Sequence, residues 1–181
     1  MLHFWERIVE FLNTAQIPYM LSGSMAMSVY TLGRSTQDFD FIVHLQPGDL
    51  DKFIAHFKDG YYYSADAMTD AFKRKTMFNI IDHATGFKVD FILLKPDEYR
   101  QVEFDRRTKV ELLDKEVFIV SGEDLLLSKL IWIQELQSGR QREDIIAIAK
   151  FPQLDWKYIW YWIKRLNLST FDLTLPNERY T

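Results

Sequence analysis

The sequence predicts an α+β fold, because short strand-like and helical segments mix in its first two-thirds and only helical spacing follows residue 121. Of the 181 residues, 48% are hydrophobic and 27% are charged, which allows a buried core and excludes an intrinsically disordered chain. The chain also has no internal repeat and no linker rich in Pro, Gly or Ser. We therefore expect a single compact unit: an α/β core over 1–120 with a helical segment over 121–181 packed on it.

The first part of the chain alternates helix and strand. Apolar residues at Phe4, Ile8, Phe11 and Leu12 repeat with helical spacing, which predicts an opening helix. In order, we expect this helix closed by Pro18, a strand over 19–21, a helix over 25–32 ending at Gly33, a strand over 39–45, and a helix from Pro47 to about 57.

Two hairpins and three helices are predicted for the remainder. The hairpins pair 75–82 with 87–94, and 109–113 with 117–120 around a turn at Asp114-Lys115. Ser121 and Asp124 resemble a capping box, which predicts the start of a helix over 123–136. A second helix over 140–150 follows, and a last one carries an apolar stripe of Trp156, Ile159, Trp160, Ile163 and Leu166.

Composition also limits the location, the chemistry and the partners that the chain is expected to have. The chain has no cysteine, which excludes disulfides and thiolate chemistry and predicts a cytoplasmic location. No apolar run approaches the roughly 20 residues of a membrane span, and the first residues do not resemble a signal peptide. A net charge of −4 argues against a broad surface for duplex nucleic acid.

Three acidic residues stand in or beside apolar strands. Asp38 and Asp40 precede Phe41-Ile42-Val43, and on a strand residues i and i+2 share a face about 6.6 Å apart. Asp90 interrupts a second apolar strand. If the two strands are neighbours, three carboxylates converge, and they repel one another unless a cation lies between them. Such hard oxygen ligands are typical of Mg²⁺ or Mn²⁺ in a two-metal phosphoryl-transfer site.

A phosphate-binding turn is predicted upstream of the acids. Gly23-Ser24 lies between a strand and a helix, where glycine permits close approach of a ligand to the backbone. The N–H groups and positive dipole at the start of the helix then favour an anion. Each motif alone is common in surface turns, so the prediction depends on their order: strand, Gly-Ser, helix, Asp-x-Asp strand and a later acidic strand.

This order resembles the polymerase-β-like nucleotidyltransferase superfamily over about residues 19–94. Arg34-Ser35-Thr36-Gln37-Asp38-Phe39-Asp40 is further similar to small bacterial members related to abortive-infection (AbiEii-like) toxins. The resemblance implies a mixed sheet flanked by helices, with Asp38, Asp40 and Asp90 as catalytic metal ligands for Mg²⁺ or Mn²⁺. It also implies nucleotide contacts from Gly23, Ser24, Lys129 and Asp144. Arg34 and Thr36 would steady the turn that aims Asp38.

The resemblance implies transfer of NMP from an NTP to an acceptor hydroxyl, with release of pyrophosphate. The acceptor stays open between RNA, protein and a small molecule of the aminoglycoside type. An antitoxin-like partner is an option of this branch, although Glu143 replaces a lysine usual in the toxins. Trp156, Trp160 and Trp162 either pack the last helix on the core or form part of a homodimer interface. The rival interpretation is a non-catalytic nucleotide- or partner-binding domain. Lys129 is equally compatible with an ordinary solvated helix lysine.

Overall fold

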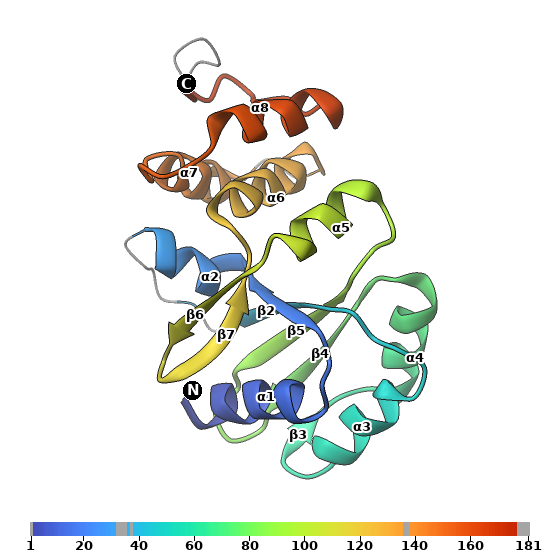
Figure 1. Ribbon diagram of the computed structural model, residues 1–181. Helices are drawn as coiled ribbons and strands as arrows, with labels where there is room; N and C mark the ends of the chain where they lie inside the picture. The colour runs from blue at the N-terminus through green and yellow to red at the C-terminus, as the bar shows by residue number, and fades with distance from the viewer. Residues whose placement is uncertain (1, 32–35, 37, 136–137, 177–181) are drawn as a thin grey trace.

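The computed structural model describes residues 2–31, 36, 38–135 and 138–176, and Figure 1 shows their arrangement. Within these residues, eight helices and seven strands confirm the predicted α+β class. The helices are α1 (Leu2–Thr14), α2 (Gly23–Tyr30), α3 (Asp49–His56), α4 (Ala65–Arg74), α5 (Glu98–Asp105), α6 (Gly122–Glu135), α7 (Gly139–Ile148) and α8 (Trp156–Arg165). The strands are β1 (Tyr19–Ser22), β2 (Asp38–Val43), β3 (Tyr61–Tyr62), β4 (Met77–Asp82), β5 (Lys88–Leu93), β6 (Thr108–Leu112) and β7 (Lys115–Ile119).

One mixed sheet forms the centre of the molecule, with the order β3-β4-β5-β2-β1-β7-β6. Both predicted hairpins are present, β4 with β5 and β6 with β7. The strand of Asp38 and Asp40 was expected to lie beside the strand of Asp90, and this is confirmed because β2 and β5 pair in parallel. The two strands that carry the acidic residues therefore lie side by side.

The two faces of the sheet differ because residues alternate along each strand. On one face, Phe39 and Phe41 of β2 contact Trp5 of α1, and Phe91 of β5 contacts Phe53 of α3. These aromatic contacts hold α1 and α3 on that face. The opposite face carries Asp38, Asp40 and Asp90, as the strand pairing requires. Apolar packing on one face thus directs the acids to the other.

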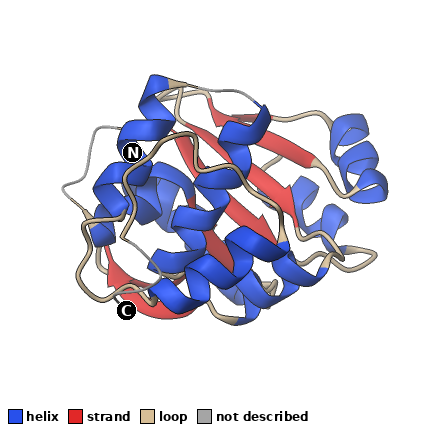
Figure 2. Ribbon diagram, turned by 90° about the horizontal axis from the view of Figure 1, so that it is seen from above, coloured by secondary structure: helices blue, strands red, loops and turns tan. Residues whose placement is uncertain are grey.

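Helices α6, α7 and α8 stack beyond the end of the sheet that is upper in Figure 1, and Figure 2 shows helices surrounding the sheet. The predicted capping pair is present: Asp124 N donates to Ser121 Oγ at 3.1 Å. The fully buried Asp124 carboxylate also accepts hydrogen bonds from Arg106 Nε (3.0 Å) and Tyr158 Oη (2.7 Å). This polar cluster fastens α6 to the core and to α8. Within the described residues, no helix is long and apolar enough to cross a bilayer.

The structure corrects several element boundaries. Helix α2 spans Gly23–Tyr30, so it begins two residues before the predicted start at 25 and ends two residues before the predicted end at 32, because Thr31 is already extended with φ −140°. The predicted C-cap, Gly33, lies outside the described residues. The β6–β7 turn is centred on Leu113 and Asp114, whose φ angles are 49° and 58°, one residue before the predicted position. Helix α3 starts at Asp49, because Gly48 adopts φ 90° and separates it from Pro47.

The tryptophans of the last helix pack within the chain. Trp156 and Trp162 are buried, and Trp162 contacts Tyr99 of α5. Trp160 donates through Nε1 to the carbonyl of Pro176 at 2.9 Å. Their apolar surface therefore serves the intramolecular core of α8.

Candidate active site

The acidic residues meet on adjacent strands. Asp40 of β2 is in register with Asp90 of β5, and Asp38 is in register with Lys88. Because paired residues on neighbouring strands share a face, these four side chains form the corners of one patch. Asp90 is 7% exposed, and its Oδ1 atom is buried without a hydrogen-bond partner within the described structure.

Burial and like charge both act on Asp40. Burial, together with the neighbouring carboxylates Asp90 and Asp38, raises the pKa of Asp40 from 3.8 to about 6. In the absence of a cation, the ionised form of Asp40 therefore destabilises the folded chain. A carboxyl pKa raised by burial and by neighbouring carboxylates is more typical of functional sites than of structural ones.

A lysine lies within the acidic patch. Lys88 Nζ donates to Asp90 Oδ2 at 2.7 Å and lies 4.0 Å from Asp38 Oδ1. Burial works against the charge of Lys88, but the hydrogen bond and attraction of the carboxylates outweigh it, so the pKa of Lys88 is raised. Two of the three acids are thus paired with an internal cation.

The Gly-Ser turn approaches the acidic patch closely. Gly23 opens α2 with φ +64°, and a Cβ atom at this position would lie 1.9 Å from Asp40 Oδ2. No side chain larger than hydrogen therefore fits between the turn and the carboxylate. Ser24 follows in the first turn of α2 and lines the same pocket as Asp40. Ser22, in register with Asp40, makes no side-chain cap to the helix.

The turn before Asp38, which was predicted to orient this carboxylate, lies partly within the described residues. Thr36 Oγ1 accepts from Asp38 N and donates to Asp38 O, both at 3.3 Å. This contact agrees with the predicted steadying role. Arg34 lies outside the described residues.

Helix α6 forms the opposite wall of the site. Lys129, 6% exposed, donates through Nζ to Asp144 Oδ2 at 2.7 Å and to Gln141 Oε1 at 3.4 Å. The alternative of a solvated helix lysine is therefore wrong. Its charge is still felt across the site, because it acts to lower the pKa of Asp40. Asp144, also expected to contact nucleotide, is buried as the partner of Lys129.

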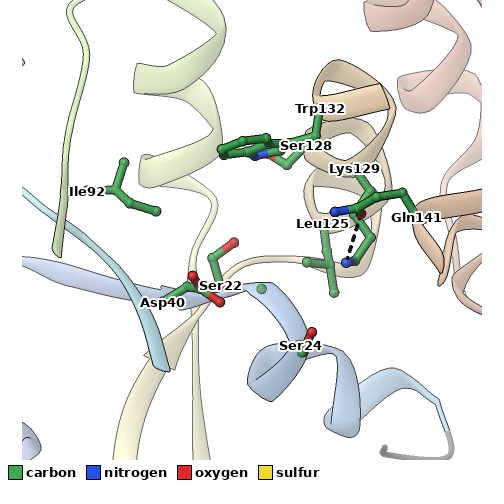
Figure 3. A pocket seen from close by; sticks show the side chains of 10 residues that line it. Ser22, Ser24, Asp40, Ile92, Leu125, Ser128, Lys129, Trp132 and Gln141 are labelled. Carbon is green, nitrogen blue, oxygen red and sulfur yellow. Dashed lines mark hydrogen bonds between the residues drawn. The ribbon is translucent and has the colours of Figure 1, made fainter. Parts of the chain in front are cut away.

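A pocket of about 230 Å³ joins these features. Figure 3 shows Asp40 and Ser22 on one side of it, Ser24 at the α2 turn, and Lys129 and Trp132 projecting from α6. Its remaining lining residues are Gly23, Ile92, Leu125, Ser128 and Gln141. The pocket therefore places the start of α2, a carboxylate and an ammonium group around one space.

A second pocket of about 190 Å³ adjoins the first and shares Ser22, Ile92, Ser128 and Trp132 with it. Ile42 and Ile92, which line it, lie two residues beyond Asp40 and Asp90 on the same face of the sheet. Its other lining residues are Leu93, Leu94, Lys95, Arg100, Ile131 and Glu135. Trp132 thus lines both pockets, of which the first reaches the acidic patch at Asp40.

The donor set of the patch suits a divalent metal ion. Asp38 and Asp40 offer carboxylate oxygens, which are the ligands that Mg²⁺ and Mn²⁺ prefer. The unpartnered Asp90 Oδ1 is a buried acceptor that lacks a cation or a donor. However, within the described part of the chain no three acidic or histidine side chains converge closely enough to enclose a metal ion. Lys88 holds Asp90 Oδ2 instead.

Lys88, Trp132 and Gln141 were not predicted as site residues. Strand alternation could have indicated Lys88, because it lies two residues before Asp90. Helical spacing could have indicated Trp132, one turn beyond Lys129. For Gln141 the sequence holds no comparable signal, since its position depends on how α7 packs against α6.

Comparison with solved structures identifies the fold. The antibiotic-resistance factor ANT(2'')-Ia aligns in its solution structure with a TM-score of 0.64 at 11% identity, covering 92% of this chain and 90% of that one. Its crystal structure with adenylyl-2''-tobramycin gives 0.63 at 11% identity, covering 92% and 96%. The lincomycin-bound lincosamide adenylyltransferase LnuA gives 0.54 at 17% identity, covering 83% and 96%.

No protein-family model and no curated protein sequence matches the chain. The likeness is therefore one of three-dimensional structure: the chain has a nucleotidyltransferase-like fold, as the sequence resemblance implied.

Proposed function

We propose that this protein is a metal-dependent nucleotidyltransferase that moves an NMP unit from an NTP to an acceptor hydroxyl and releases pyrophosphate. The observation that carries the proposal is the register of Asp40 with Asp90, beside the Gly23 turn and under α6. Asp40, the start of α2 and the buried Lys129 then line one pocket, and Asp38 and Asp90 lie beside Asp40 on the same face of the sheet. Phosphoryl transfer depends on this kind of positioning and charge complementarity.

Each group has a role in this proposal. The Gly23 and Ser24 N–H groups and the α2 dipole receive the terminal phosphates. The ammonium group of Lys129, held by Asp144, faces the phosphates from the opposite wall. The acidic patch holds Mg²⁺ or Mn²⁺, which when bound neutralises phosphate charge and favours departure of pyrophosphate.

The transfer step conserves atoms and charge. An acceptor oxygen forms a bond to the α-phosphorus, and the bond from that phosphorus to the α–β bridging oxygen breaks. The hydroxyl proton passes to a carboxylate, for which the unpartnered Oδ1 of Asp90 is the suitably buried acceptor. Trp132 would stack against a base or an acceptor ring, because its exposed indole lines both pockets.

We further propose a small hydroxyl compound as acceptor. The second pocket is concave, lies along the same face as the acids and is mostly apolar, as small-molecule sites are. The net charge of −4 disfavours a nucleic-acid acceptor. ANT(2'')-Ia with adenylyl-2''-tobramycin and LnuA with lincomycin supply the first compounds to test.

The test is a transfer assay with each of the four NTPs, Mg²⁺ or Mn²⁺, and an acceptor panel of tobramycin, lincomycin, tRNA and protein. We expect pyrophosphate release and a labelled small molecule from the native chain. Asp40→Asn should abolish both, whereas Asp59→Asn, at a side chain 86% exposed, should change neither. Labelling of tRNA or protein alone would support the toxin-like alternative. NTP binding without transfer to any acceptor would support the non-catalytic one.

A further inference from the structure

The acidic patch contains one cation of its own. Asp38 and Asp40 on β2 face Lys88 and Asp90 on β5, so three anions and one cation occupy the four corners. Lys88 lies beside Asp38 across the strands and beside Asp90 along its own strand. A second divalent ion shared by Asp38 and Asp90 would have to enter the region that the ammonium group already neutralises.

The contacts of Lys88 are those of a built-in ion pair. Its Nζ is 2.7 Å from Asp90 Oδ2 and 4.0 Å from Asp38 Oδ1, and its side chain is 33% exposed against 9% for Asp90. Partial burial strengthens such a pair relative to one on an open surface. The pair also fixes the Asp90 carboxylate by one oxygen and leaves the other, Oδ1, buried without a partner.

We propose that Lys88 is the resident counter-cation of this site, so that the acidic patch takes one divalent ion, at Asp38 and Asp40, rather than two. The inference rests on the proposed function for the identity of the ligand as a divalent ion. Lys88 is then a positioning residue: it neutralises Asp90 and fixes its carboxylate through Oδ2.

The experiment counts metal ions without turnover. Mn²⁺ alone is titrated into the native chain, Lys88→Met and Lys109→Met, and binding is followed by electron paramagnetic resonance and calorimetry. Lys109 is a matched control, because it also lies on a strand and pairs with a carboxylate, Glu116, at 2.7 Å. Methionine keeps the unbranched side chain up to the position of Cε and removes the charged ammonium group.

We expect one bound Mn²⁺ in the native chain and in Lys109→Met, and two in Lys88→Met. The first ion should also bind Lys88→Met about tenfold more tightly or better, because the repelling unit charge is gone. Lys88→Arg, which keeps the charge, should still bind one. Thermal melting establishes that each variant is folded, and the native count alone tests the proposal if Lys88→Met does not fold.

Two Mn²⁺ ions in the native chain would overturn the resident-cation proposal and leave the nucleotidyltransferase proposal standing. The same holds if a folded Lys88→Met binds one ion with native affinity. No Mn²⁺ binding by the native chain or by Lys88→Met would count against both proposals.

Discussion

Replacing Asp40 by asparagine tests whether this carboxylate serves function at the expense of stability. The substitution keeps the size and shape of the side chain and removes its ability to ionise. Asp40 lies against Gly23 and in register with Asp90, so the ionised form is crowded by negative charge and by burial. We therefore expect the metal-free variant to be more stable than the native chain at neutral pH.

The magnitude follows from the displaced pKa. A rise from 3.8 to about 6 is roughly two units, and each unit corresponds to about 1.4 kcal/mol. The folded chain binds this proton more tightly than the unfolded chain does, so the native state loses stability as pH rises through this window. The loss begins near pH 4 and is complete above about pH 7. Because Asp40 keeps some contact with solvent, we expect a gain of about 1–3 kcal/mol for Asp40→Asn at pH 8.

The assay is urea unfolding at pH 5 and pH 8 in a buffer that contains a chelator. The gain in the free energy of unfolding of Asp40→Asn over the native chain should be larger at pH 8. In a thermal melt, a gain of about 2 kcal/mol should raise the melting temperature by roughly 4–8 °C for a chain of this size. Asp38→Asn is the control, because its side chain is 52% exposed, and we expect a change within about 0.5 kcal/mol.

Two results would refute this reasoning. A loss of about 3–5 kcal/mol in Asp40→Asn would indicate a structural ion pair rather than a strained functional carboxylate. An equal gain at both pH values would show that ionisation of Asp40 is not the cause.

Three further predictions concern the walls of the pocket. Gly23→Ala should destabilise the chain by about 1–3 kcal/mol and weaken NTP binding measured by calorimetry, because its Cβ would meet the Asp40 carboxylate at a positive φ; native-like affinity would contradict the proposed turn. Lys129→Met should cost about 3–5 kcal/mol in urea unfolding, since it leaves the buried Asp144 carboxylate without this ammonium; a cost below 1 kcal/mol would show that the pair is dispensable. Trp132→Ala, at a side chain 54% exposed, should change stability by less than about 0.5 kcal/mol but weaken nucleotide or acceptor binding about tenfold; unchanged binding of both would exclude stacking.

The sequence was sufficient for the centre of the fold because the relevant signals are local. Alternation placed Asp38 and Asp40 on one face of β2, and apolar residues around Asp90 indicated a second strand. The strand pairing then required only that the two strands be neighbours, which the structure confirms. Both hairpins and the helices of the C-terminal segment were predicted for the same reason.

What could not be predicted depends on contacts between distant segments. Helices α4 and α5 were missed, because each is short and buries few apolar side chains: Met68 and Ala71 in α4, and Tyr99 and Phe104 in α5. Strand β3 is only two residues long and exists through its pairing with β4. The partnership of Lys129 with Asp144 requires α6 and α7 to pack together, and no local pattern encodes that geometry.

The site as a whole is poorly explained by stability alone. A fold selected only for stability would not set Asp40 against Asp90 on neighbouring strands, nor remove a side chain at Gly23 to admit the carboxylate. Lys88 offsets part of the repulsion, yet it contacts Asp90 and leaves Asp40 with a raised pKa. The uncompensated charge is therefore concentrated at the carboxylate that lines the pocket, beside the Gly-Ser turn. A ligand that brings positive charge to that point offsets the cost, and an NTP with its divalent cation has the required chemistry.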